Sequence, residues 1–213
     1  MSRIIAFSLY GSHPMYYVGM LRNCELAPKI YPEWRVWVYV SPEVNNIWRQ
    51  KYIDAGARVI DAAVELGNCG LPNLGHLGAF WRFLPPRDPN VEMMISRDAD
   101  SRLNIRERAA VDAWINSGMK FHSMRDHYNH HYHYFMAGMW GVRGHLDILP
   151  LIRDYKFDGH KGEDQEWQKA RLVPIAKTSC LEHGINGQPF PPHAPYNGFV
   201  GQRFTENEVG MPD

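Results

Sequence analysis

The segment Val91–Ser96 (VEMMIS) is followed directly by Arg97-Asp98-Ala99-Asp100. Its mostly apolar residues predict a buried strand. In an extended chain, side chains two residues apart point to the same side. The carboxylates of Asp98 and Asp100 would therefore lie on the same side of the segment. Ligands bind at the carboxyl ends of the strands in open α/β sheets. This stretch therefore predicts an acidic site at the edge of a largely parallel sheet.

Strands and helices alternate along the chain on both sides of this segment. That alternation predicts the α/β class, with a mostly parallel sheet flanked by helices. Asn104 is the expected N-cap of the helix that follows the acidic pair, with Glu107 in a capping box and Gly118 at its end. From Thr178 onward the chain reads as mostly loop. The other strands are expected at Arg3–Leu9, Arg35–Val40, Arg58–Ile60 and Lys120–Met124, and the helices at 14–27, Val44–Ala55, Leu74–Leu84, Ile105–Ser117, Leu146–Tyr155 and Glu163 to about Arg171.

Length and charge narrow the class of protein. With 213 residues, one domain is expected. The formal net charge is zero and no basic stripe is present, which argues against a nucleic-acid partner. No apolar run reaches the roughly 18 residues of a membrane span, and no signal-peptide pattern is seen. The three cysteines, Cys24, Cys69 and Cys180, are widely spaced, which predicts no disulfide framework and a cytoplasmic protein.

The acidic pair suits a hard metal ion. Carboxylate oxygens are the preferred ligands of Mg²⁺ and also suit Mn²⁺. Such an ion takes further ligands from substrate phosphates, which a nucleoside diphosphate would supply. From the residues alone, a solvated loop or a cluster capping the next helix is an equally good interpretation of Asp98 and Asp100.

Four further segments occur in an order that resembles the GT-A class of glycosyltransferases. Among these enzymes the closest motifs are those of the retaining family that includes glycogenin and bacterial lipopolysaccharide galactosyltransferases, and the chain as a whole is similar to virus-encoded glycosyltransferase domains. The segments are Phe80–Leu84, Phe135–Met139, which resembles a strand of that family, Asp164-Gln165, and His183–Phe190.

The resemblance implies one catalytic domain over residues 1–213, with a nucleotide-binding sheet. Its donor-binding half would span about 1–103 and its acceptor-side half about 104–213. The implied reaction moves a hexose or 6-deoxyhexose from a UDP-sugar to a glycan acceptor, with a Mn²⁺ or Mg²⁺ cofactor and retention of configuration favoured. The expected location is the cytoplasm, which is the host cytoplasm if the protein is virus-encoded.

The same resemblance assigns roles to individual residues. Asp164 and Gln165 would lie beside the anomeric carbon as catalytic residues, and Asp98, Asp100 and His183 would hold the metal. Asp164 as a general base would serve inversion, whereas retention would use a phosphate oxygen of the donor near Gln165. Phe7 and Leu9 could equally be core residues. The donor-binding residues would be Phe7, Ser8, Leu9, Tyr10, Arg82, Asp98 and Gly138.

Three residues depart from the pattern of that family. Met136 stands in place of an asparagine that binds sugar, and Glu166 replaces an aspartate. Gln188 replaces a lysine that binds phosphate. The first two leave the identity of the sugar open, and the third removes an expected contact to the diphosphate.

A polar stretch, Arg125–Tyr134 (RDHYNHHYHY), gathers four histidines among tyrosines. It could bind zinc or line a sugar cleft, and a non-enzymatic sugar- or zinc-binding module is one alternative function. A sugar nucleotidyltransferase is another, although no glycine-rich, lysine-containing loop is seen near the N-terminus. The four histidines are His127, His130, His131 and His133.

Overall fold

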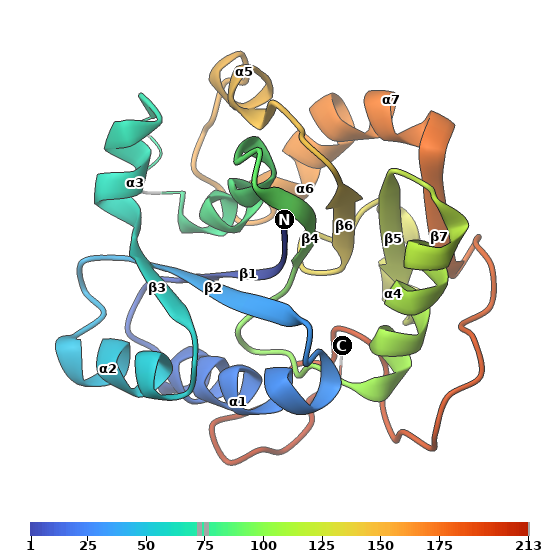
Figure 1. Ribbon diagram of the computed structural model, residues 1–213, viewed down its shortest axis with the longest axis horizontal. Coiled ribbons are helices and arrows are strands. Elements are labelled where there is room, and N and C mark those ends of the chain that lie inside the picture. The colour runs from blue at the N-terminus through green and yellow to red at the C-terminus, as the bar shows by residue number, and fades with distance from the viewer. Residues whose placement is uncertain (72–73, 75–76, 213) are drawn as a thin grey trace.

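The computed structural model describes residues 1–71, 74 and 77–212 (Figure 1). Seven strands form one sheet in the order β3-β2-β1-β4-β6-β5-β7. Among the strands described, β6 alone runs antiparallel to its neighbours. The expected parallel-dominated sheet is therefore confirmed, and it continues without a break across the two predicted halves. The strands are β1 (Ser2–Leu9), β2 (Trp34–Val40), β3 (Arg58–Asp61), β4 (Val91–Ser96), β5 (Phe121–Arg125), β6 (Trp140–Arg143) and β7 (Cys180–Gly184).

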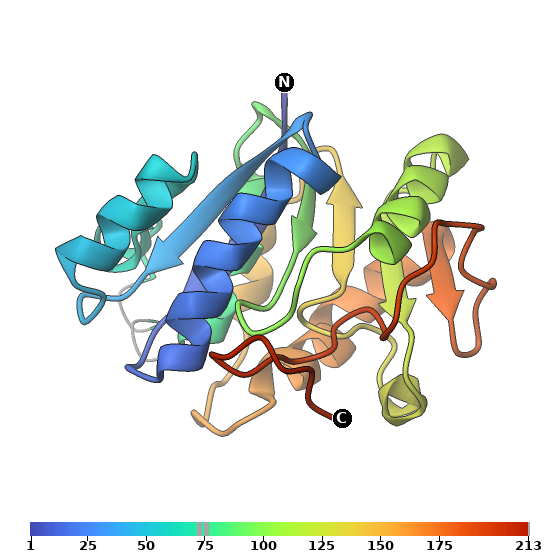
Figure 2. The same cartoon turned by 90° about the horizontal axis from the view of Figure 1, so that it is seen from below.

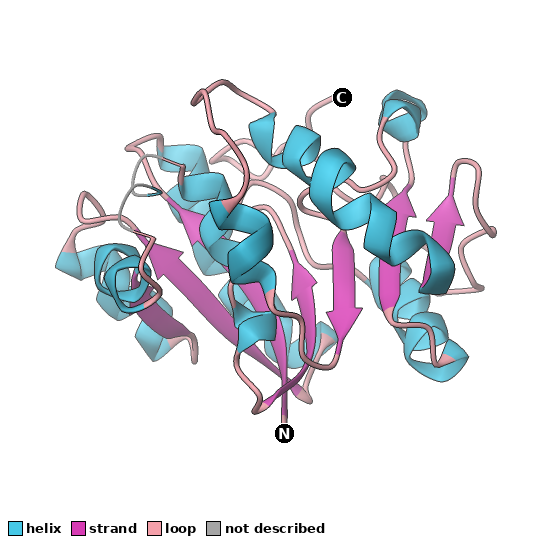
Figure 3. Ribbon diagram, turned by 90° about the horizontal axis from the view of Figure 1, so that it is seen from above, coloured by secondary structure: helices cyan, strands magenta, loops and turns pink. Residues whose placement is uncertain are grey.

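Helices cover both faces of the sheet, as Figures 1 and 3 show. Side chains of β1 alternate between two cores, because successive residues of a strand point to opposite faces. Ile5 and Phe7 pack with α1 (Pro14–Ile30), α2 (Asn46–Asp54) and α4 (Ile105–Ser117). Ile4 and Ala6 pack on the opposite face. That second face is covered by α3 (Ala62–Asn68), η2 (Gly78–Phe83), α5 (Ile148–Arg153), α6 (Glu163–Trp167) and α7 (Val173–Ala176).

The start and end of α4 agree with the sequence prediction in part. The Asn104 side chain accepts a hydrogen bond from the Glu107 backbone N–H at 2.9 Å, and Gly118 ends the helix with φ of 72°. The Glu107 carboxylate does not complete a capping box. It is buried and bonds instead to Tyr31 Oη at 3.0 Å and Arg97 Nε at 3.3 Å.

The segment before β4 differs from the predicted helix Leu74–Leu84. Gly78–Phe83 forms the 3₁₀ helix η2, and Pro85–Arg87 forms a second one, η3. The prolines therefore begin a new turn, since proline is tolerated where a helix starts. Residues 75–76 of the prediction lie outside the described residues.

The C-terminal part of the chain holds more regular structure than its sequence indicates. β7 pairs in parallel with β5, where loop was expected. Phe135–Met139, which resembles a strand, is a turn that leads into β6. The predicted helix from Glu163 is confirmed but continues past Arg171 through the π-helical η5 (Gln168–Leu172), α7 and η6 (Lys177–Ser179). No helix among the described residues is long and apolar enough to cross a bilayer.

A buried ion pair joins the end of β4 to α4. Arg97 and Glu107 are each 1% exposed, and Tyr31 at the end of α1 completes the network. Burial raises the pKa of Glu107, while Arg97 and the Tyr31 hydroxyl act in the opposite direction. The pair fixes the point where the chain leaves β4, immediately before the acidic residues.

We expect Glu107→Ala to lower the free energy of unfolding by about 3–5 kcal/mol, because it leaves the Arg97 cation buried without its partner. Urea denaturation at pH 7 measures the loss. Glu25→Ala is the matched control, since it removes a carboxylate from an exposed pair with Arg22 and should cost less than about 1 kcal/mol. Equal losses in the two variants would contradict the assigned role of the buried pair.

Candidate functional site

The acidic pair lies in a turn directly after β4, at the carboxyl ends of the parallel strands. The chain is not extended there, because Ser101 N–H donates to the Asp98 carbonyl at 3.3 Å. The Asp98 side chain is 39% exposed and that of Asp100 is 10% exposed. Burial and the neighbouring Asp98 charge raise the pKa of Asp100, and Arg203 opposes the rise. The Asp98 carboxylate therefore acts electrostatically on Asp100, and both side chains come from the same turn.

Arg82 connects the acidic pair to Asp164. Its Nη1 donates to Asp98 Oδ1 and also to the Arg97 carbonyl at 3.2 Å, while its Nη2 donates to Asp164 Oδ2 at 3.2 Å. The side chain of Arg82 is almost fully buried. These contacts raise its pKa, although burial alone would lower it. A permanent cation thus sits between two carboxylates that come from distant parts of the sequence.

Ser8 helps to place this arginine. The Ser8 hydroxyl accepts a hydrogen bond from the Arg82 backbone N–H at 3.0 Å, which ties η2 to the end of β1. Phe7 and Leu9 are fully buried in the core with α1. Because they are buried, the side chains of Phe7 and Leu9 are out of reach of a nucleotide. Ser8 and Tyr10 remain the candidates of this segment for contact with a donor.

Tyr10 borders the site. Its ring rests on Gly78, where a Cβ atom would overlap the ring, and meets Trp81 edge-on at 5.9 Å between centroids. The pKa of Tyr10 is raised by burial, and Arg82, Asp164 and Asp98 all act on it. Because the ring stays 47% exposed, it presents a face to a ligand beside these charges.

Gly138 is required by a close approach. A Cβ atom at this position would overlap the Asp98 carboxylate. The turn that carries Gly138 is held by the Ser96 hydroxyl, which donates to the Ala137 carbonyl at 2.8 Å. The glycine therefore lets the backbone of one loop pack directly against an acidic side chain.

Asp164 is placed by the loop before α6. The Glu163 carboxylate accepts hydrogen bonds from the backbone N–H groups of Asp158 at 2.5 Å and Gly159 at 2.9 Å. Asp164 itself accepts one from Gln165 N–H at 3.0 Å. Burial raises the pKa of Asp164, Arg82 lowers it and Asp98 raises it. The carboxyl Oδ2 that meets Arg82 is thus held at the first turn of a helix.

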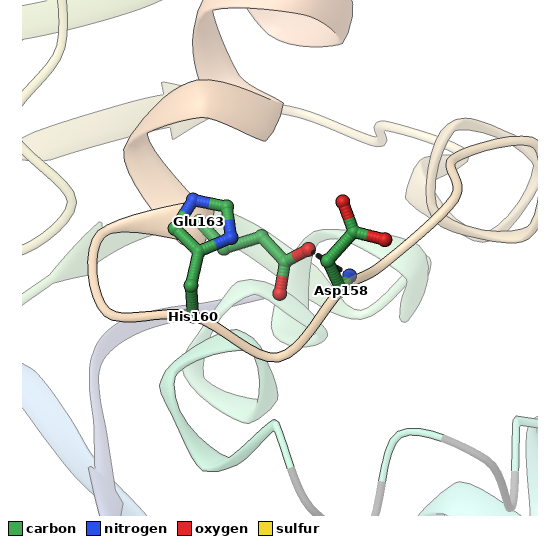
Figure 4. Close-up of side chains that lie close together, drawn as sticks. All are labelled: Asp158, His160 and Glu163. Carbon is green, nitrogen blue, oxygen red and sulfur yellow. Dashed lines mark hydrogen bonds between the residues drawn. The ribbon is translucent and has the colours of Figure 1, made fainter.

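Figure 4 shows Asp158, His160 and Glu163 around this loop. Among the described residues, these side chains make up the one group of three or more whose metal-ligating atoms lie within 4.8 Å of one another. Asp158 and His160 are exposed, and Glu163 already bonds to the backbone. The group explains how the loop is closed, and nothing further in its surroundings points to an ion.

His183 does not join the acidic pair. It is 1% exposed, and its Nδ1 lies 2.9 Å from Nε2 of His122. Burial lowers its pKa to about 4. Within the described part of the chain, no group of ligating atoms brings it together with Asp98 and Asp100. The geometry does not support His183 as a third ligand.

The sequence analysis missed Arg203. Its Nε donates to Asp100 Oδ2 at 3.0 Å, and the neighbouring Phe204 N–H donates to the Asp100 carbonyl at 2.8 Å. Glu208 pairs with the largely buried Arg102, which anchors the same segment. In Figure 2 this dark-red C-terminal segment runs along the lower side of the molecule toward α1. No local signal marks an arginine in a loop for contact with a residue so far away in sequence.

The histidine-rich stretch forms the short helix η4 (Tyr128–Tyr132). His127 Nδ1 accepts from Asn129 N–H at 3.3 Å, and His130 Nδ1 accepts from His127 N–H at 3.2 Å. These two rings cap the helix. In the described chain, the four histidines of the stretch contribute to no group of three closely spaced ligands, so the zinc alternative finds no support here.

The fold of the described chain is that of the GT-A class of glycosyltransferases. Solved structures of this class match the chain at low identity. Glucosyl-3-phosphoglycerate synthase from Mycobacterium tuberculosis, in complex with Mn²⁺, UDP-glucose and phosphoglyceric acid, is 10% identical, with 85% of this chain and 68% of that chain covered and a TM-score of 0.52. Its complex with UDP is 11% identical, with 90% and 73% covered and a TM-score of 0.51.

A glycosyltransferase involved in glycosylation of the major capsid of PBCV-1 is 12% identical, with 86% and 81% covered and a TM-score of 0.48. No protein-family model and no curated protein sequence matches the chain. At these identities the likeness establishes the GT-A fold, and the activity has to be argued from the site.

The contacts of Arg82 with Asp98 and Asp164 predict that the stability of the chain depends on pH. The pKa of Asp164 is raised on folding. The free energy of unfolding therefore falls as the pH rises from the ordinary pKa of an aspartate through the higher pKa of Asp164 in the folded chain. Arg82→Leu removes the opposing charge and raises this pKa further. We expect a loss of about 2–3 kcal/mol in unfolding free energy at pH 7, below the range for a fully buried pair, and a clearly smaller loss at pH 4.

Urea denaturation at both pH values provides the measurement. Arg22→Leu, which breaks an exposed pair with Glu25, should change stability little at either pH. Equal losses for Arg82→Leu at pH 4 and pH 7 would show that the arginine acts through packing alone.

Proposed function

We propose that the chain is a metal-dependent glycosyltransferase that moves a hexose or 6-deoxyhexose from a UDP-sugar to a glycan acceptor with retention of configuration. The observation that carries the proposal is the Arg82 guanidinium between Asp98 and Asp164, at the ligand-binding edge of a GT-A sheet. Support for the donor and the metal comes from the structural neighbours, two of which hold Mn²⁺ with UDP-glucose.

Asp98 and Asp100 fit a divalent cation. Both offer carboxylate oxygens, and each lies in the electrostatic field of the other. Gly138 lets the Asp98 carboxylate lie against the backbone of its loop, where any Cβ atom would displace it. These are the ligands that Mg²⁺ and Mn²⁺ take when they also bind a diphosphate. When bound, the metal would supply positive charge to the departing diphosphate.

Arg82 would add fixed positive charge to the same leaving group. Its two Nη groups are held by carboxylates, whereas its buried Nε has no hydrogen-bond partner among the described residues. Preorganised charge of this kind needs no rearrangement during the reaction, which makes it effective in stabilising a transition state.

Asp164 and Gln165 would contact the transferred sugar. Gln165 Oε1 is buried without a hydrogen-bond partner in the described structure, and so is free to accept from a sugar hydroxyl. In a retaining reaction the proton of the acceptor hydroxyl moves to a phosphate oxygen of the donor. Asp164 is tied to Arg82, and it would orient the sugar rather than take that proton.

The proposal extends to the organisation and location of the protein. The donor-binding half would comprise about residues 1–103 and the acceptor-side half about residues 104–213. Cys24, Cys69 and Cys180 are free thiols, which suits the reducing conditions of the cytoplasm.

The metal assignment predicts that UDP and Mn²⁺ stabilise the chain jointly. At 100 times its dissociation constant, a ligand adds about 2.7 kcal/mol, a rise in Tm of several degrees for a chain of this size. Asp98→Asn and Asp100→Asn should each abolish the joint shift and nearly abolish sugar transfer. Asp54→Asn, on the exposed face of α2, is the control and should keep both. Full shifts in both site variants would rule out this metal site.

Arg203 predicts opposite effects on metal and nucleotide. Without nucleotide, its guanidinium pairs with Asp100 and competes with a cation. With nucleotide, it is free to bind the diphosphate, for which Gln188 offers no charge. Arg203→Ala should therefore tighten Mn²⁺ binding alone by a few-fold and weaken UDP binding by about tenfold, the scale of a charged hydrogen bond.

Isothermal titration calorimetry with Mn²⁺ alone, and with UDP at saturating Mn²⁺, measures both effects. Arg35→Ala, at an exposed position of β2, is the control and should alter neither. If Arg203→Ala weakened both ligands equally, a general loss of the fold at this edge would be the better explanation.

A further inference from the structure

Two tyrosines of η4 are the most exposed aromatic residues in the described chain. Tyr128 is 73% exposed and Tyr132 is 74% exposed. The His131 ring lies between them, with centroid distances of 4.8 Å to Tyr128 and 3.7 Å to Tyr132. His131 Nδ1 also lies 2.5 Å from the Tyr128 carbonyl, which fixes its ring. His131 thus contacts both tyrosine rings, at interplanar angles of 41° and 38°, and we name these three side chains the ring platform.

The platform stands on an anchored loop. Below it, His130 is buried, and the His127 ring packs on Phe199 at 4.6 Å. On its C-terminal side, the Ser123 hydroxyl donates to the Tyr134 carbonyl at 2.6 Å. A loop held at both ends presents its rings at low entropic cost, which favours ligand binding.

The platform lies at the same edge of the sheet as the acidic site. β4 and β5 both run antiparallel to β6, so their carboxyl ends face the same way. In Figure 2 the yellow-green coil of η4 projects past the end of β5 on the lower side of the molecule. The chain then passes from the platform to Gly138, which packs on Asp98.

His133 links the two places electrostatically. Burial lowers the pKa of His133, Lys169 acts in the same direction, and Asp164 and Glu166 raise it. The residue directly after Tyr132 is therefore within electrostatic range of Asp164, the residue proposed to orient the transferred sugar. A molecule seated on the platform would lie at the same edge of the sheet as the proposed donor site.

The chemistry of the platform suits a pyranose ring. The negative face of an aromatic ring attracts polarised C–H groups such as those on one face of a sugar. The Tyr hydroxyls and the His131 ring supply hydrogen bonds for its hydroxyls.

We propose that Tyr128, His131 and Tyr132 form the subsite that binds the glycan acceptor. The inference rests on the proposed function, because it assigns this surface to the acceptor of that reaction. The platform determines which glycan is held, while Asp98, Asp100 and Arg82 act on the donor.

The test compares the full chain with the double variant Tyr128→Ala/Tyr132→Ala. Saturation-transfer NMR uses a panel of methyl pyranosides and disaccharides of glucose, galactose, fucose and xylose, without nucleotide. The best-bound sugar then serves as acceptor with UDP-sugar donors. We expect the double variant to lose the NMR signal and to raise the acceptor KM at least tenfold. Donor KM, and the Tm shift with UDP and Mn²⁺, should stay unchanged.

Two further variants define the contact. Tyr128→Phe/Tyr132→Phe keeps the rings and should retain most of the acceptor affinity. Ile47→Ala removes an equally exposed apolar side chain on α2 and should change nothing. The inference is overturned if no sugar binds the wild-type chain, if the double variant keeps the wild-type acceptor KM, or if its donor KM rises in step.

The outcomes separate this inference from the proposed function. If UDP and Mn²⁺ have no effect on the stability of the wild-type chain, the proposed reaction is ruled out. The role of the platform as its acceptor subsite is then ruled out as well. If the double variant binds UDP and Mn²⁺ normally and keeps the wild-type acceptor KM, only the acceptor subsite is ruled out. The proposed reaction then stands.

Discussion

The Arg82 guanidinium between Asp98 and Asp164 is the interaction on which the rest of the site depends. A buried cation is stable only when fixed partners replace the water it has lost, and here the partners come from the turn after β4 and the first turn of α6. The pair of contacts therefore joins the turn after β4 to the start of α6. Ser8, Gly138 and Glu163 each help to hold one of these three side chains in place.

The interactions that hold Arg82, Asp98 and Asp164 in place are mainly contacts with the backbone. Ser8 bonds the backbone of Arg82, and the Glu163 carboxylate closes the loop before Asp164. Gly138 lets a loop rest against Asp98. Because the charges are held by backbone that is itself hydrogen-bonded, they keep their positions without a ligand. A site preorganised in this way suits reactions in which charge develops on a leaving group.

Both halves of the chain supply residues to the edge of the sheet where the parallel strands have their carboxyl ends. Asp98 and Asp100 belong to the proposed donor-binding half, while Arg203, Gly138 and the ring platform all come from the segments after α4. One continuous sheet carries both halves, so their relative positions are fixed by strand pairing. The proposed donor and acceptor subsites thus lie at the same edge of the sheet, because the carboxyl ends of β4 and β5 face the same way.

Local pattern was sufficient for the parallel-dominated sheet, for β4, for the N-cap and the terminal glycine of α4, and for Asp98 and Asp100 as an acidic pair. Arg82 and Asp164 became site candidates only through the resemblance to a known family. Hydrophobic periodicity and capping depend on residues that are close in sequence, so they can be read from it. Only the tertiary structure revealed β7, the turn at Asp98, the pairing of His183 with His122 and the contact of Arg203 with Asp100. Each of these depends on burial or on a hydrogen-bond partner distant along the chain, and such partners leave no local signal.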